Sequence, residues 1–145
     1  MKKINNYRRS NKKGSIYREF NLSSIVKQPM TTKSELEYVA EKLNIEPLRI
    51  VWSKDIDPSY KGPQIINLGN MNLGGTHWTA SYKDMYFDSF GLIPPQILED
   101  YDYEYVPLQL QRTTEGFCGN WCILWLYYAM QNEIDKFYNL FNTVA

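Results

Sequence analysis

Residue types that commonly define a function are scarce in this chain of 145 residues. It contains two cysteines, Cys118 and Cys122, and a single histidine, His77. A disulfide scaffold needs more cysteines at wider spacing, so we expect reduced thiols in a reducing compartment. No run of about eighteen apolar residues is present, so no transmembrane helix is expected. These scarcities argue against the disulfide-rich and membrane-spanning classes and leave few candidates for a nucleophile or a base.

Acidic side chains are absent from the first 18 residues, which carry seven basic ones. The remaining residues carry 9 basic and 16 acidic side chains, so a basic arm precedes an acidic body. Such arms bind nucleic acid through phosphate contacts, although a solvated tail has the same composition. The arm lacks the apolar stretch of a signal peptide, so secretion is not expected. The residues that we assign to DNA binding are Lys2, Lys3, Arg8, Arg9, Lys12 and Lys13.

Composition and hydrophobic periodicity predict a flexible basic arm over residues 1–15 and a single domain over residues 16–145. Early in the domain, apolar residues at helical spacing follow a capping box formed by Thr32 and Glu35. This pattern predicts a helix over residues 32–44. Two shorter helices are expected further along the chain, over residues 94–100 and 133–142.

β-Branched and aromatic runs separated by turn residues predict five strands. These are expected over residues 48–52, 64–68, 76–82, 85–90 and 103–108. A short turn joins the third and fourth strands, which should form a hairpin. The almost wholly apolar segment 118–131 is too long for a strand and predicts a buried central helix. The pattern as a whole predicts an α+β fold in which a mostly antiparallel sheet packs on that helix.

Cys118 is the candidate nucleophile because it begins the predicted buried helix. The N–H groups and the dipole at a helix N-terminus favour a thiolate, which is the reactive form of cysteine. The Cys118 N–H could also stabilise the oxyanion that forms during acyl transfer. Gly119 beside it would let a substrate backbone approach closely. The alternative for Cys118 is a buried structural cysteine, which is a common use of the residue.

His77 could take the thiol proton and return it to a leaving amine. Asp88 is expected on the return strand of the same hairpin, where its carboxylate could hold the imidazole in one tautomer. Asp84 is closer in sequence but occupies the turn. Aspartate is disfavoured in strands, and orienting a histidine would explain its presence at position 88. In the segment before Cys118, either Gln109 or Gln111 could donate a side-chain amide to the oxyanion.

Four short motifs follow one another in the domain: GTHW at 75–78, FDSFG at 87–91, Gln111, and FCGNWC at 117–122. Together they resemble the adenovirus protease and related viral maturation proteases, distant relatives of the SUMO- and ubiquitin-like-specific proteases. The resemblance covers residues 32–130 and selects Gln111 over Gln109, because the viral branch places its glutamine seven residues before the nucleophile. It implies a papain-like cysteine protease fold with permuted catalytic order, namely His77, Asp88, Gln111 and Cys118.

The same resemblance implies a cysteine endopeptidase that cleaves viral or mobile-element precursor polypeptides after small motifs of the Gly-Gly type. Gly75, Trp78 and Gly119 would then contact the substrate. Both cysteines lie within CGNWC, so no thiol is left for the covalently linked peptide activator of the adenovirus enzyme. We therefore expect no cofactor and no metal, and any activation by DNA or a peptide to be non-covalent. We expect a monomer in the virion or in the host cytoplasm or nucleus.

Two features depart from the adenovirus pattern: the chain is short for the viral branch, and Asp88 stands where that enzyme has glutamate. Three alternatives therefore stay open. A protease of the same fold could act on SUMO or ubiquitin-like conjugates with the same chemistry. Cys118, Cys122 and His77 could instead bind zinc, although no fourth ligand is evident. A catalytically inactive relative could bind nucleic acid through the basic arm.

Overall fold

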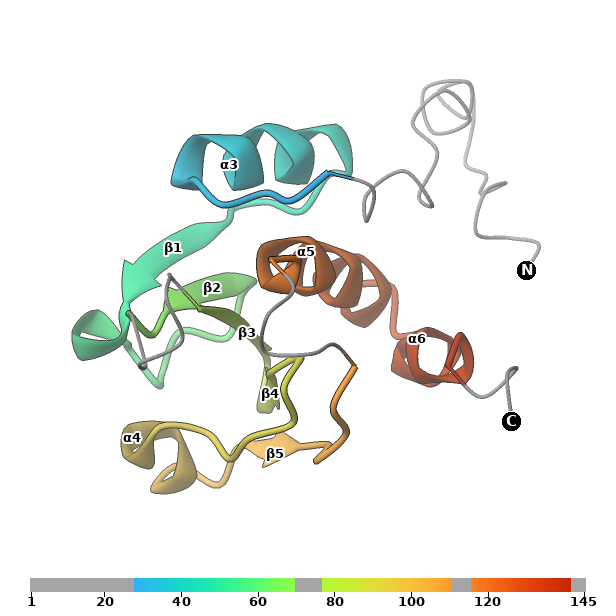
Figure 1. The fold of residues 1–145 in the computed structure, drawn as a ribbon. Coiled ribbons are helices and arrows are strands. Elements are labelled where there is room, and N and C mark those ends of the chain that lie inside the picture. Colours follow the sequence, from blue (N-terminus) through green and yellow to red (C-terminus); the bar gives the residue numbers. More distant parts are fainter. Residues whose placement is uncertain (1–27, 70–76, 111–115, 142–145) are drawn as a thin grey trace.

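The computed structural model describes residues 28–69, 77–110 and 116–141. The basic arm, Gly75 and Gln111 lie outside these described residues. In the described ranges the chain forms a sheet with helices against both of its faces (Figure 1). In chain order the elements are α3 (Lys33–Lys42), β1 (Arg49–Trp52), the 3-10 turn η2 (Ser53–Asp55), β2 (Gln64–Asn67), β3 (Trp78–Tyr82), β4 (Met85–Phe87), α4 (Gln96–Glu99), β5 (Glu104–Tyr105), α5 (Cys118–Ala129) and α6 (Ile134–Asn139).

Helix α3 begins at the predicted capping box. The Glu35 N–H donates to Thr32 Oγ1, and the Thr32 N–H donates to Glu35 Oε1, both at 3.1 Å. These reciprocal bonds satisfy two of the donors that a helix N-terminus leaves without intrahelical partners. On the buried face of the helix, Leu36 and Ala40 pack into the core, as the helical spacing predicted.

The five strands form one mixed sheet in the order β1-β2-β3-β4-β5. The central pairs β2–β3 and β3–β4 are antiparallel, whereas the edge pairs β1–β2 and β4–β5 are parallel. The α+β class is therefore confirmed. The prediction of a mostly antiparallel sheet is wrong, because two of the four strand pairs are parallel and two are antiparallel. The reason is that the connections over residues 53–63 and 88–103 are long enough to cross back over a sheet end, which a tight turn cannot do.

Helix α5 lies against one face of the sheet, with α3 and α6 packed beside it (Figure 1). Eleven of its twelve residues are buried, and only Trp121 is partly exposed. A helix that is apolar all round is expected to be buried in this way, so the predicted central helix is confirmed. The sheet residues that join its core cluster include Ile65, Ala80 and Phe87.

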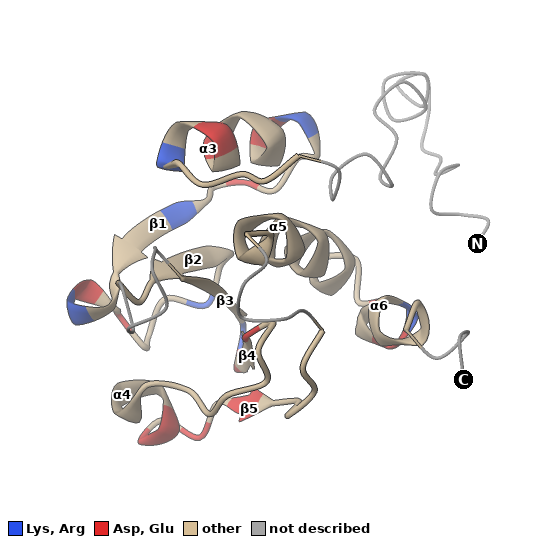
Figure 2. Ribbon diagram, in the orientation of Figure 1, with Lys and Arg blue, Asp and Glu red and all other residues tan. Residues whose placement is uncertain are grey.

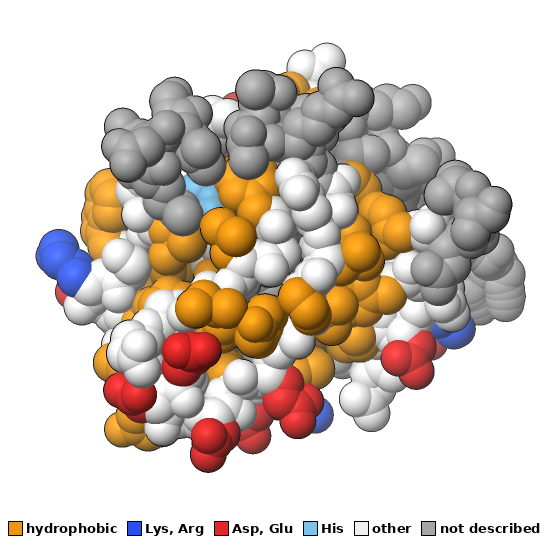
Figure 3. All heavy atoms as spheres, turned by 60° about the horizontal axis from the view of Figure 1, so that its bottom comes forward, with side chains coloured by type: hydrophobic (Ala, Val, Ile, Leu, Met, Phe, Trp, Pro, Cys, Tyr) orange, Lys and Arg blue, Asp and Glu red, His pale blue; other side chains and the backbone are white. Residues whose placement is uncertain are grey.

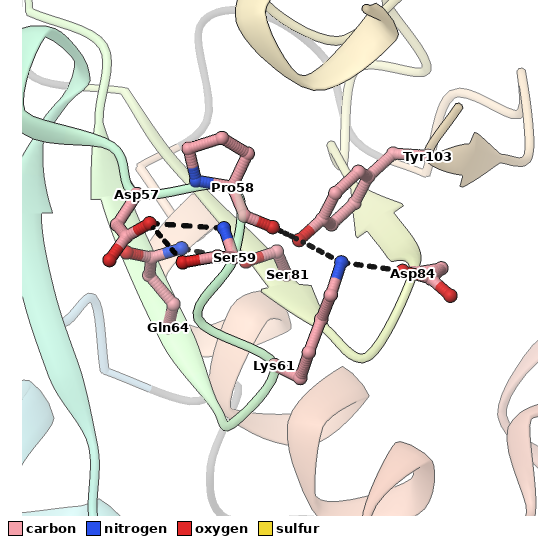
Figure 4. Close-up of polar contacts among 8 residues, drawn as sticks. All are labelled: Asp57, Pro58, Ser59, Lys61, Gln64, Ser81, Asp84 and Tyr103. Carbon is pink, nitrogen blue, oxygen red and sulfur yellow. Dashed lines mark hydrogen bonds and ion pairs between the residues drawn. The ribbon is translucent and has the colours of Figure 1, made fainter. Parts of the chain in front are cut away.

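The opposite face of the sheet has a smaller core, because alternate residues of a strand point to opposite sides. This second cluster consists of Ile56, Ile66, Tyr86, Leu98 and Tyr103, with Leu98 contributed by α4. A polar network at its border fastens the β1–β2 connection to the hairpin turn (Figure 4). The Tyr103 hydroxyl donates to Pro58 O at 2.8 Å, and Lys61 Nζ donates to Asp84 Oδ1 at 2.6 Å.

Candidate active site

His77, Asp88 and Cys118 come from three elements that meet at one end of the sheet. His77 immediately precedes β3, Asp88 immediately follows β4, and Cys118 is the first residue of α5. The backbone of His77 continues the sheet ladder, since its N–H donates to Gly69 O at 3.2 Å and its carbonyl accepts from the Leu68 N–H at 2.9 Å. The position of the histidine is therefore set by the sheet.

The imidazole of His77 is held by Asp88. Its Nε2 lies 2.8 Å from Asp88 Oδ1, and both side chains are almost completely buried. The same carboxylate oxygen accepts the Phe90 N–H at 2.8 Å, which orients the carboxylate toward the ring. A buried carboxylate in this position fixes the tautomer and the rotation of the imidazole.

The other ring nitrogen, Nδ1, has no hydrogen-bond partner of good geometry among the described residues. Nδ1 is therefore the nitrogen left for proton exchange with Cys118. In the Ser-His-Asp triad the two nitrogens have the opposite roles, with Nδ1 facing the aspartate and Nε2 facing the nucleophile. Burial lowers the pKa of His77, but interactions with Asp88 and Cys118 outweigh it and raise the pKa to about 9. Base–nucleophile contacts are often long without substrate and tighten when it binds.

The sulfur of Cys118 accepts a hydrogen bond from the Trp78 N–H at 3.4 Å. This contact places the thiol beside the residue that follows His77. Because Cys118 is the first residue of α5, the partial positive charge of the helix N-terminus also acts on its sulfur. A backbone donor, the helix N-terminus and the imidazole of His77 all act on this sulfur, so the arrangement suits a nucleophilic cysteine.

Cys122 lies one helical turn further along α5, in a different environment. Its side chain is fully buried in the core. Burial, followed by the proximity of Cys118 and of Asp88, raises the pKa of its thiol well above the ordinary value. A thiol that stays protonated is a poor nucleophile, so only Cys118 has the surroundings of a reactive cysteine.

Asp84, the other aspartate that was considered for the histidine, is placed elsewhere. It lies at the hairpin turn and forms an exposed ion pair with Lys61 at 2.6 Å (Figure 4). The strand that precedes Asp88 ends at Phe87, one residue earlier than Asp88 and three earlier than predicted. Asp88 is thus the first residue after the strand, where a carboxylate can bend back toward the ring.

Two of the three predicted substrate contacts, Trp78 and Gly119, lie next to Cys118 in the structure. Trp78 is buried in the core, so plain packing explains its side chain. A Cβ on Gly119 would lie 2.6 Å from Met30 O and 3.0 Å from Leu36 Cδ2. Close packing of the chain on itself is thus enough to require glycine at 119, and the substrate contacts stay predictions.

Two residues that sequence reasoning did not single out contribute to the site. Phe90 stacks on His77, with ring centroids 4.1 Å apart and planes 6° apart. The register Ala80↔Phe87, continued outward, places position 90 opposite position 77. A two-residue turn at Lys83 and Asp84 implies the same pairing, so the signal for Phe90 was present in the sequence. The second residue is Asn120, and no local pattern predicts its partners in residues 28–30.

An apolar surface adjoins the site on the side of α4 and β5. It contains six of the eight large hydrophobic side chains that are exposed in the described residues. Figure 3 shows this face, where hydrophobic side chains gather beside acidic ones. The Leu110 N–H donates to Ser89 O at 2.7 Å, so the segment that follows β5 lies beside the turn that follows Asp88. The exposed residues are Leu92, Ile93, Ile97, Tyr101, Val106 and Leu108.

A glycine in the turn after Asp88 permits this close approach. Gly91 has a φ of +77°, and its N–H donates to Asp88 O at 2.8 Å. A Cβ at this position would lie 2.8 Å from the carbonyl carbon of Leu108. Both the left-handed backbone and the lack of space require glycine. The last residue of the FDSFG motif therefore has a structural role in shaping the site.

Comparisons of the chain with protein-family models, with curated proteins and with solved structures found no match. The described residues contain no group of three or more His, Cys, Asp or Glu side chains that could hold a metal ion. Cys118, Cys122 and His77, the set considered as an alternative zinc site, do not form such a group. None of the described helices is both long enough and apolar enough to span a bilayer.

The distribution of charge on the described part of the chain is shown in Figure 2. Acidic residues lie on α4 and β5, whereas α5 carries no charged side chain at all. From Asp84 to Leu110 the sequence contains no lysine or arginine. The surface beside the site is therefore apolar and acidic.

Proposed function

We propose that this chain is a cysteine endopeptidase of the adenovirus-protease type, in which Cys118 is the nucleophile. The observation that carries the proposal is that Asp88 Oδ1 lies 2.8 Å from Nε2 of His77, while Cys118 Sγ accepts the N–H of the next residue, Trp78, at 3.4 Å. Nucleophile, base and orienting acid are the parts that acyl transfer through a thiol requires. Four sequence motifs in the family's order support the same conclusion.

The reaction would proceed by two displacements at a peptide carbonyl. The Cys118 thiolate attacks the carbonyl carbon, and the C–N bond breaks as the protonated imidazole of His77 gives its proton to the leaving amine. A water molecule then attacks the thioester, His77 takes its proton, and the thiolate leaves. The Cys118 N–H and, by resemblance, Gln111 would stabilise the oxyanion in both steps.

The substrate that we propose is a viral or mobile-element precursor polypeptide, cut after a small motif of the Gly-Gly type. The motif preference follows from the family resemblance. The apolar surface formed by Leu92, Ile93, Val106, Leu108 and their neighbours offers contacts for an extended chain next to the site. We further propose that the basic arm binds DNA, since its six positive charges suit phosphate contacts.

Covalent labelling tests the proposal directly. A peptide vinyl sulfone ending in Gly-Gly should modify Cys118 alone, as located by mass spectrometry of the digested protein. Cys118→Ala should abolish labelling while the circular dichroism spectrum is unchanged. Labelling of Cys122, or no labelling of a folded chain, would contradict the assignment.

Substrate comparison separates the two protease classes. Gly-Gly-X peptides should be cleaved at least as efficiently, by kcat/KM, as the matching bond in SUMO or ubiquitin conjugates. A strong preference for a folded ubiquitin-like protein would favour a conjugate protease instead.

DNA binding should weaken steeply with salt and should be lost on deletion of residues 1–15. Unchanged binding by the truncated chain would remove that role from the arm.

A further inference from the structure

The side-chain amide of Asn120 connects the first turn of α5 to the segment that precedes α3. Its Nδ2 donates to Gln28 O at 2.7 Å, and its Oδ1 accepts the Met30 N–H at 2.8 Å. These two backbone groups flank Pro29, so one amide pairs with the segment on both sides of the proline. The Asn120 side chain is completely buried. Both of its polar ends are thus used in a single clamp between segments about ninety residues apart.

The clamped segment packs directly on the turn that carries the candidate nucleophile. A Cβ added to Gly119 would lie only 2.6 Å from Met30 O, too close for a real contact. Met30 itself is buried in the same core cluster as Cys118 and Cys122. The backbone of residues 28–30 therefore forms one wall of the first turn of α5, and Asn120 supplies its hydrogen bonds.

This clamp fixes a helix end that has no side-chain cap, and it bonds to backbone groups of residues 28 and 30 rather than to the N–H groups of the helix. Phe117, at the cap position of α5, makes no side-chain cap hydrogen bond. Helix first turns without a cap are less stable, because their N–H groups have no intrahelical partners. Asn120, the third residue of the helix, holds the turn from the side instead. The turn that it holds places Cys118 Sγ at 3.4 Å from the Trp78 N–H.

We propose that Asn120 is a positioning residue for Cys118. Its amide clamp fixes the first turn of α5 against residues 28–30, so that the sulfur stays beside the Trp78 N–H and the imidazole of His77. The consequence for peptide cleavage rests on the proposed function. The consequence for thiol reactivity does not, because it can be measured on Cys118 without any substrate.

Asn120→Ala is the test, with Gln64→Ala as the matched control. Gln64 is also a fully buried amide with two hydrogen bonds, to Arg49 Nε and to Ser81 Oγ, both at 3.0 Å. It lies at the other end of the paired strands, away from the site; Figure 4 shows its contact with Ser81. Removal of either amide should lower the melting temperature, but only Asn120→Ala should change the reactivity of the Cys118 thiol.

The readout is the rate at which iodoacetamide alkylates Cys118, measured from pH 5 to 9 below the melting temperature of each variant. In Asn120→Ala the rate near neutral pH should fall about tenfold, because a sulfur that moves away from the Trp78 N–H and the imidazole loses the contacts that make it reactive. Gln64→Ala should keep the wild-type profile. A profile of Asn120→Ala that overlays the wild type would overturn the proposal.

A second variant covers the case in which Asn120→Ala fails to fold. Asn120→Ser also removes the clamp, but it leaves a hydroxyl and room for a water molecule in a polar space. It should show the same loss of alkylation, together with faster hydrogen exchange at the Met30 amide. A Met30 amide that stays as protected as in the wild type would show that Asn120 does not hold it.

The clamp and the proposed function fail in different ways. In one outcome, Cys118 is reactive in the wild type and loses this reactivity in Asn120→Ala, but no Gly-Gly-X peptide is cleaved. That outcome supports the clamp and contradicts the peptidase. Unchanged kcat and alkylation in Asn120→Ala, in a chain that does cleave such peptides, contradict the clamp and support the peptidase.

Discussion

Phe90 lies parallel to the imidazole of His77, with ring centroids 4.1 Å apart. The two residues face each other where the register of the β3–β4 hairpin continues beyond the last ladder pair. The backbone N–H of Phe90 also donates to Asp88 Oδ1 at 2.8 Å. One residue thus limits the movement of the ring by its side chain and orients the ring's carboxylate partner by its backbone.

Phe90→Leu should slow peptide cleavage while leaving the fold intact. The variant keeps the N–H that Asp88 accepts but loses the flat surface that restrains the imidazole. We expect kcat to fall about 10- to 100-fold with KM nearly unchanged, because small misplacements of a catalytic group have effects of that size. Phe87→Leu is the control, since Phe87 is a buried aromatic residue that stacks on Trp125. Equal losses in both variants would point to general destabilisation.

Asp88→Asn should leave a folded but much slower enzyme. The imidazole would lose the anion that fixes its tautomer, and kcat should fall about 10³- to 10⁴-fold. The pKa of His77, followed by NMR of its ring protons, should drop from the value of about 9 in the native chain. Asp84→Asn, which removes only the exposed ion pair with Lys61, should keep near-normal activity. Near-normal rates in Asp88→Asn would exclude it as the orienting acid.

The pKa of His77 predicts a pH dependence of stability. Its ordinary value is 6.5, and the folded chain raises it to about 9. A raised pKa stabilises the folded state fully below pH 6.5, and this contribution disappears as the pH rises through 9. The loss should be on the order of 3 kcal/mol. Urea denaturation at several pH values measures it, and His77→Gln should remove most of the slope. The same slope in His77→Gln would assign it to other groups.

The two cysteines should differ in their importance. Cys118→Ala should abolish cleavage without unfolding the chain, because it removes the nucleophile alone. Cys122→Ser should retain substantial activity, since burial raises the pKa of that thiol and keeps it protonated. Cleavage assays and thermal melts on both variants make the comparison. Activity in Cys118→Ala together with its loss in Cys122→Ser would reverse the nucleophile assignment.

Gly119→Ala should destabilise the chain because Met30 O occupies the space that the new methyl group needs. We expect a loss of about 1–3 kcal/mol in unfolding free energy, as for other overpacked sites. Gly116→Ala is the control: its Cβ would lie 3.9 Å from Pro29 Cβ, an ordinary contact. Chemical denaturation of both variants provides the measurement. A Gly119→Ala chain as stable as Gly116→Ala would show that residues 28–30 can move away.

Local patterns predicted the elements whose stability comes from neighbours in the chain. The capping box at Thr32 places the start of α3 to within one residue. The apolar run from Cys118 identifies the buried helix, and the turn at Lys83 and Asp84 identifies the hairpin. Strand lengths were less well predicted. The strand expected over residues 103–108 is β5, which spans only Glu104–Tyr105. It is shorter because the segment that follows it leaves β4 and turns toward Ser89.

By itself, the sequence determined which residues could carry the chemistry: one histidine, two cysteines at helical spacing, and an aspartate on the return strand of a hairpin. The tertiary structure alone decided that His77 binds Asp88 through Nε2, that β1 pairs in parallel with β2 and β5 with β4, and that Asn120 binds the segment before α3. The physical reason is that these relations join groups far apart in the chain. Their free energy depends on packing and burial that exist only once the whole domain has formed.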